Sequence, residues 1–93
     1  MPKVKGVEMK VWEIERFAIR ITHPDGKDVR GDKANMRRYK FEKMAPNDNT
    51  VEVWKTNRFR KLYARFDVQV LYANNEVAPG NTKLGTVRDS YLD

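Results

Sequence analysis

The sequence predicts an α+β domain with a small, mostly antiparallel sheet of four to five strands and two helices packed on one face. Two observations support this fold class. Apolar residues alternate in short segments that lead into two tight turns, at 23–26 and 74–75, which is typical of hairpins. A segment with helical spacing, 49–66, lies between the hairpins. The 93 residues are expected to form a single domain, 1–93, because this length supports one modest core.

The N-terminal part of the chain has a less regular pattern. Residues 1–6 show no periodicity, and we expect this basic N-terminus to fray. Across 7–22, apolar side chains mostly alternate with polar ones. This pattern indicates two strands, or one long strand with a bulge near 13–16 that switches the inward face. A helix over 8–16 is the alternative interpretation.

The two turn regions repeat a pattern when Phe17 is aligned with Phe66 without a gap. Each copy reads as a strand, a tight turn, a short return strand, a glycine and a helix-capping residue. Either two unrelated hairpins share the same turn chemistry, or the chain contains a pseudo-symmetric pair of ββ units. The aligned residues are Ile19 with Val68, Ile21 with Val70, His23 with Tyr72, Asp25-Gly26 with Asn74-Asn75, and Gly31-Asp32 with Gly80-Asn81.

The central segment begins with residues that favour a helix start. Asn49 is a good N-cap, and Glu52, three residues later, can complete a capping box. Apolar residues then fall on one face of a helical wheel, which predicts that Leu62 and Phe66 are buried. From Phe66 the period changes to two, so a strand should follow almost at once. The apolar face consists of Val51, Phe59, Leu62, Tyr63 and Phe66.

Two further elements complete the predicted fold. Residues 37–44 alternate apolar with charged side chains and predict a strand that ends before Pro46. Near the C-terminus Pro79-Gly80 breaks the return strand, and Asn81 or Thr82 can cap a last helix. The apolar residues of that helix are Leu84, Val87 and Tyr91.

Composition limits the classes of function. Nineteen basic and 13 acidic residues give a formal net charge of +6, which favours polyanionic or acidic partners. The chain has no cysteine, so it has no disulfide and no thiolate ligand. No apolar run reaches membrane-spanning length, and the N-terminus lacks a signal-peptide pattern. We therefore expect a cytoplasmic protein without a membrane partner.

Residues for catalysis or metal binding are scarce. The single histidine, His23, precedes Pro24 in a turn, and a zinc site lacks the ligands that it needs. Glu13 and Glu15 would share a strand face, which is more typical of a solvated surface than of a catalytic pair. No glycine-rich phosphate loop occurs. We expect no catalytic residue, metal or cofactor; an unusual nuclease built on scattered acids is the remaining enzymatic alternative.

Basic residues form two clusters. Five cations and no acid occur between 55 and 65, and on a helical wheel Arg58, Lys61 and Arg65 form a ridge beside Trp54. Phosphates require several cations in register, and an aromatic ring among them can stack on a base. The second cluster includes Arg37, Arg38 and Lys40, together with Lys43 and one acid, Glu42.

These clusters suggest a small, non-enzymatic DNA- or RNA-binding accessory protein. The ridge would contact phosphates, the second cluster would assist it, and Trp54 would be a stacking platform. The alternative is a protein–protein interaction module, either a homodimer or a binder of an acidic protein, whose basic surface is merely solvated. Convergence of Trp54 and both clusters on one surface would favour nucleic acid, and dispersal would favour the alternative.

Overall fold

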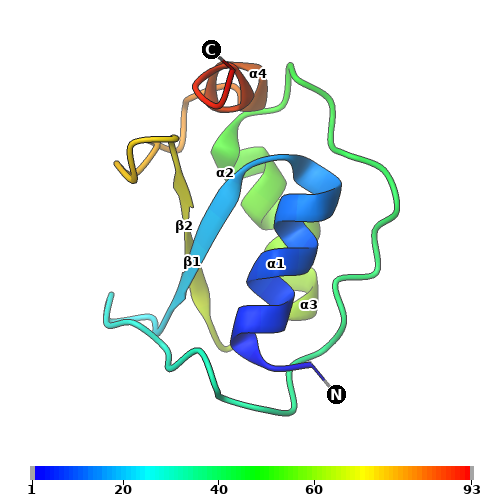
Figure 1. The fold of residues 1–93 in the computed structure, drawn as a ribbon, viewed down its shortest axis with the longest axis vertical. Helices are drawn as coiled ribbons and strands as arrows, with labels where there is room; N and C mark the ends of the chain where they lie inside the picture. The colour runs from blue at the N-terminus through cyan, green and yellow to red at the C-terminus, as the bar shows by residue number, and fades with distance from the viewer. Residues whose placement is uncertain (1, 93) are drawn as a thin grey trace.

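The structure is a computed structural model that describes residues 2–92. Its elements occur in the order α1 (Val4–Glu15), β1 (Ala18–Thr22), α2 (Val51–Trp54), η1 (Lys55–Phe59), α3 (Arg60–Leu62), β2 (Asp67–Leu71) and α4 (Leu84–Asp89) (Figure 1). α2, η1 and α3 run on without a break, so we refer to them as the central helix; η1 is a π turn in its middle. Residues 34–49, which connect the first half of the chain to this helix, are called the linker.

β1 and β2 pair antiparallel and form a two-stranded sheet. Ile19 and Ile21 in β1 are buried, as are Val68 and Val70 in β2, whereas Arg20 between the two isoleucines is exposed. Side chains alternate between the two faces of a strand. The sheet therefore buries one face, and the helices supply the apolar side chains that cover it.

The prediction of a sheet with four to five strands is wrong. Both turns are present, but each return segment makes only one isolated bridge with the preceding strand. One bridge joins Thr22 to Asp28, and the other joins Leu71 to Val77. The sequence pattern locates the turns correctly because turn chemistry is local. It does not determine how far the chain stays paired after a turn.

Residues 37–44 form no strand either, although their side chains alternate. Tyr39 is buried, Phe41 is half-buried, and the two rings pack together with centroids 5.3 Å apart. An irregular segment that passes over a core can bury alternate side chains without pairing to a sheet. The alternation was therefore a signal of partial burial and not of a strand.

The first half of 7–22 is helical, so the alternative interpretation is correct there. The alternation was misleading because Met9 is apolar but 56% exposed. Arg16 ends α1 in the left-handed region with φ of 64°, and β1 begins two residues later. The buried side chains of α1 recur at helical spacing, as expected for a surface helix; they are Val4, Val7, Val11 and Glu15.

The basic N-terminus is part of the fold. Residues 4–6, within the segment expected to fray, form the first turn of α1. The carbonyl of Pro2 accepts a hydrogen bond from the Met36 N–H at 3.0 Å, which ties this end of the chain to the linker. Met1 lies outside the described residues.

The central helix begins one residue later than predicted. Thr50 is the N-cap in place of Asn49, and its hydroxyl accepts a hydrogen bond from the Val53 N–H at 3.2 Å. Glu52 closes no capping box, because its carboxylate pairs with Arg60 at 2.8 Å. The predicted helix exists, but its cap uses the neighbouring residue of similar chemistry.

The pattern shared by the two turn regions is a repeat of backbone structure. Gly26 (φ 90°) and Asn75 (φ 70°) occupy the left-handed region at the same place in each turn. Arg20 pairs across the sheet with Gln69, which is its own counterpart in the alignment, so a local two-fold axis passes between them. The matching hydrogen bonds are His23 N–H to Lys27 O and Tyr72 N–H to Glu76 O, then Val29 N–H to Ile21 O and Ala78 N–H to Val70 O.

The repeat also includes the helix that precedes each strand. The first two N–H groups of each helix bind carbonyls at the end of the turn region of the same half, and Gly31 and Gly80 have equivalent places there, as predicted. Each unit, 3–33 or 50–82, is therefore a helix, a strand, a turn and a segment that returns to the helix N-terminus. The bonds are Val4 N–H to Lys33 O, Lys5 N–H to Gly31 O, Val51 N–H to Thr82 O, and Glu52 N–H to Gly80 O, at 2.8–3.0 Å.

The two helices of the repeat differ at η1. In α1 the buried residues Val7 and Val11 are separated by one ordinary helical turn, whereas Trp54 and Phe59 are separated by one residue more. A π turn accommodates one additional residue. It restores the apolar face of the central helix after that insertion.

Phe17 and Phe66 have the same place in the two units but different burial. Phe17 is fully buried and packs edge-on against Trp54 with ring centroids 5.1 Å apart. Phe66 and Leu62, both predicted to be core residues, are only half-buried.

We expect Phe17→Ala to lower the free energy of unfolding by about 3–5 kcal/mol, and Phe66→Ala to lower it by clearly less. Urea denaturation of both variants measures this difference, and equal losses would contradict it.

Candidate functional site

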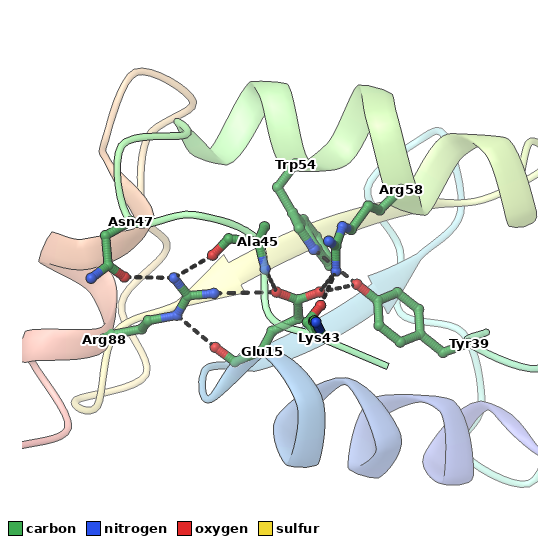
Figure 2. A network of polar contacts seen from close by, with 8 residues as sticks. All are labelled: Glu15, Tyr39, Lys43, Ala45, Asn47, Trp54, Arg58 and Arg88. Carbon is green, nitrogen blue, oxygen red and sulfur yellow. Dashed lines mark hydrogen bonds and ion pairs between the residues drawn. The ribbon is translucent and has the colours of Figure 1, made fainter. Parts of the chain in front are cut away.

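Glu15 lies at the centre of a polar network that joins four parts of the chain (Figure 2). Its side chain is fully buried; Oε2 pairs with Arg58 Nη1 at 2.6 Å, and Oε1 pairs with Arg88 Nη2 at 3.2 Å. Oε1 also accepts the Ala45 N–H at 2.8 Å, and Oε2 accepts the Tyr39 hydroxyl. A buried carboxylate is costly unless it is paired and hydrogen-bonded. This network satisfies Glu15 while connecting α1, the linker, the central helix and α4.

Arg88 occupies the α4 side of this network. Its Nε donates to the Glu15 carbonyl at 2.7 Å, and its Nη1 donates to the Ala45 carbonyl at 2.8 Å and to Asn47 Oδ1 at 2.7 Å. Burial lowers the pKa of the Arg88 guanidinium, and the Glu15 carboxylate opposes that change. The planar fork of arginine donors suits such a site, where several acceptors converge.

Sequence reasoning missed the network. It placed Glu15 beside Glu13 on a solvated strand face, and it assigned no role to Arg88. One signal was available: Glu15 follows Val11, and Arg88 follows Leu84, at the spacing of one helical face. A charged residue in line with apolar ones on a helix indicates a buried charge with a partner elsewhere in the chain.

Two of the predicted nucleic-acid contacts lie in this network. Arg58 also donates to the Lys43 carbonyl at 2.6 Å and packs over the Phe41 ring, and its side chain is only 19% exposed. Trp54 is fully buried, and its indole N–H donates to the Tyr39 hydroxyl at 3.0 Å. A buried indole offers no face on which a base can stack, and the Arg58 guanidinium is engaged by the Glu15 carboxylate and the Lys43 carbonyl.

Three other predicted residues meet at one hollow of about 530 Å³, which we call the basic hollow. Lys61 and Arg65 approach it from the end of the central helix, and Arg37 approaches it from the linker. Lys33, which sequence reasoning did not single out, is a fourth cation in the lining. The lining contains no carboxylate; its other residues are Asn35, Met36, Leu62, Tyr63, Ala64 and Phe66.

A hydrogen bond and a cation–aromatic contact hold the walls of the basic hollow in place. The Tyr63 hydroxyl donates to the Arg37 carbonyl at 2.8 Å, which fixes the linker against the end of the helix. Burial raises the pKa of Tyr63 to about 12, so this hydroxyl stays protonated at neutral pH and can donate. Lys33 lies over the Phe66 ring, with Nζ 5.8 Å from its centroid. Cations from two separate segments are thus brought to one cavity.

Helix stabilisation explains part of this cluster. Cations near a helix C-terminus interact favourably with the helix dipole, and Lys61 and Arg65 have such positions. Arg37 and Lys33 belong to the segment before the central helix, so the dipole argument does not account for them. None of the four cations forms an ion pair with an acid in the described chain.

The remaining predicted residues lie apart from the basic hollow. Arg38 lines a second hollow of about 290 Å³, which we call the N-terminal hollow. Lys40 is exposed and lines neither hollow. The structure therefore gathers Arg37, Lys61 and Arg65 and separates them from Arg58 and Trp54. Trp54 and the two complete clusters do not converge on one surface, which is the arrangement that was expected to favour nucleic acid; only part of the two clusters does. The other residues of the N-terminal hollow are Pro2, Gly6, Val7, Lys10 and Tyr39.

Acidic side chains form no cluster that could hold a metal ion in the described part of the chain. Within residues 2–92 no three histidine, cysteine, aspartate or glutamate side chains lie together as metal ligands would. Glu13 is exposed and pairs with Lys10 at 3.9 Å, so it lies apart from the buried Glu15. Within residues 2–92, no helix has the length and apolar character needed to cross a membrane.

Glu15→Gln tests the role of the buried carboxylate. The substitution keeps the shape of the side chain but leaves Arg58 and Arg88 without their counter-charge. Breaking a buried ion pair costs about 3–5 kcal/mol, so we expect a loss of that order in the free energy of unfolding. Glu13→Gln is the matched control, because an exposed pair contributes about 0–1 kcal/mol. Similar denaturant midpoints for the two variants would contradict the assignment.

Comparison with known proteins does not indicate which residues form a functional site. No match to this chain is found among protein-family models, curated proteins or solved structures.

Proposed function

We propose that this chain is a small nucleic-acid-binding accessory protein that holds backbone phosphates in the basic hollow and carries out no reaction on them. One observation supports this above the others: among the described residues, four cations and no carboxylate line a single hollow of about 530 Å³. The lack of cysteine fits the same protein acting in the cytoplasm.

The charge of the hollow favours phosphate over a single carboxylate. A cleft lined by one sign of charge concentrates the electrostatic potential and attracts ions of the opposite sign. Arg37 and Arg65 can each form paired hydrogen bonds with a phosphate, and Lys33 and Lys61 add compact charges. Each neutralised phosphate releases condensed counterions, which provides most of the affinity in binding that does not depend on sequence.

The proposal revises the roles of the predicted residues. Lys61, Arg65 and Arg37 remain phosphate contacts, and Lys33 joins them. Arg38 and Lys40 could extend the contact along the linker. Arg58 and Trp54 stabilise the fold instead, because their polar groups are engaged in the network around Glu15.

The salt dependence of binding tests the proposal. Changing Lys33, Arg37, Lys61 and Arg65 together to glutamine removes up to four phosphate contacts. The slope of log affinity against log salt should then flatten by roughly three units, since each phosphate contributes about 0.7 to 0.9. Fluorescence anisotropy with labelled oligonucleotides at several salt concentrations measures this slope.

A second variant with the same loss of charge is the control. Lys3, Arg16, Lys27 and Lys83 are exposed and line neither hollow, so their change to glutamine should leave most of the slope intact. Equal effects of the two variants would indicate that only net charge matters. If the wild-type protein binds no oligonucleotide even at low salt, the proposal fails, and an acidic protein becomes the partner to test.

A further inference from the structure

The N-terminal hollow differs in character from the basic hollow. Its volume is about 290 Å³, and its lining combines the apolar groups of Pro2, Val7 and Tyr39 with two cations, Lys10 and Arg38. This size lies near the lower limit of small-molecule sites, which are usually apolar with a few polar groups that orient the ligand. The hollow therefore suits an apolar ring attached to a negatively charged group.

Gly6 keeps this hollow open. It lies in the first turn of α1 and does not adopt a positive φ, so the backbone does not require glycine there. A Cβ added at Gly6 would meet only the Pro2 Cβ, at 3.8 Å, which is an ordinary contact. Since alanine would fit and favours helices more strongly, the main structural effect of glycine at this position is the open space that it leaves.

The linker forms a wall of both hollows. Met36 and Arg37 line the basic hollow, and the next two residues, Arg38 and Tyr39, line the N-terminal hollow. The Met36 N–H donates to the Pro2 carbonyl at 3.0 Å, which holds this part of the linker against the N-terminus. Consecutive Cα atoms are about 3.8 Å apart, so the linings of the two hollows adjoin at the linker between Arg37 and Arg38.

We propose that the N-terminal hollow receives one unstacked base of a single-stranded nucleic acid whose phosphates occupy the basic hollow. This inference rests on the proposed function and specifies its ligand. Arg38 would attract the phosphate next to that base, assisted by Lys10, whose exposed pair with Glu13 is long at 3.9 Å. The apolar lining would contact the ring. A base in a duplex is paired and stacked, so the site selects single strands or the unpaired ends of duplexes.

Three probes of equal length separate base binding from phosphate binding. They are a labelled single-stranded oligonucleotide of about 12 nucleotides, an abasic oligomer with the same backbone, and a duplex. The abasic oligomer keeps the phosphates but has no ring to enter the hollow. Wild-type protein should bind the single strand roughly fivefold or more tightly than the abasic oligomer, as expected for one bound base.

Gly6→Leu fills the N-terminal hollow and tests the assignment directly. Its affinity for the single strand should fall to that for the abasic oligomer, and its salt slope should not change. Gly31→Leu is the matched control, because its Cβ would also meet only one atom, the Lys5 Cβ at 3.8 Å, and it lines neither hollow. Gly6→Ala provides a smaller change if the leucine variant does not fold, with a smaller loss of affinity in the same direction.

The outcomes distinguish this inference from the proposed function. If the Gly6 variants bind the single strand as tightly as wild type does, no base occupies the hollow, although phosphate binding stands. The inference is also overturned if the variants lose affinity for the abasic oligomer to the same extent. Wild-type protein that binds none of the three probes at low salt would overturn the proposed function itself.

Discussion

The fold depends on one buried carboxylate and the two arginines that neutralise it. Glu15 is provided by α1, Arg58 by the central helix and Arg88 by α4, so these ion pairs connect elements that the two-stranded sheet alone does not hold together. The linker contributes the Ala45 N–H and the Tyr39 hydroxyl, whose pKa is raised by burial and by its hydrogen bond to Glu15. The network thus determines the path of the linker, and the linker in turn forms walls of both hollows.

The position of the basic hollow follows from a difference between the two units of the repeat. α4 follows the second unit and packs at the end of α1, where Tyr91 lies edge-on to Trp12 with ring centroids 5.0 Å apart and Arg88 binds the Glu15 carbonyl. The first unit is followed by the irregular linker and not by a helix. At the corresponding end of the central helix, Tyr63 lines the basic hollow. α4 thus covers the end of α1, whereas the irregular linker, and not a helix, lies at the equivalent end of the central helix. The basic hollow lies at that second position.

The sequence predicts features that depend on neighbouring residues and fails where distant residues decide the structure. The turns at 23–26 and 74–75, the strand after Phe66 and the central helix were predicted, because glycine, asparagine and apolar spacing act locally. The number of strands was wrong, since it depends on pairing between return segments. The partners of Glu15 could not be found from local pattern, because Arg58 and Arg88 are 43 and 73 residues away.

The same reasoning explains why the cations of the predicted basic ridge have different partners in the structure. A helical wheel shows which cations share a face, but not which acids lie opposite them in the folded chain. Arg58 is paired with Glu15 and Arg60 with Glu52, whereas Lys61 and Arg65 form no ion pair within the described residues. A basic run therefore divides into cations that pair with an acid and cations that have no such partner within the described residues. Of these four cations, only Lys61 and Arg65 line the basic hollow, where Arg37 and Lys33 add to their field.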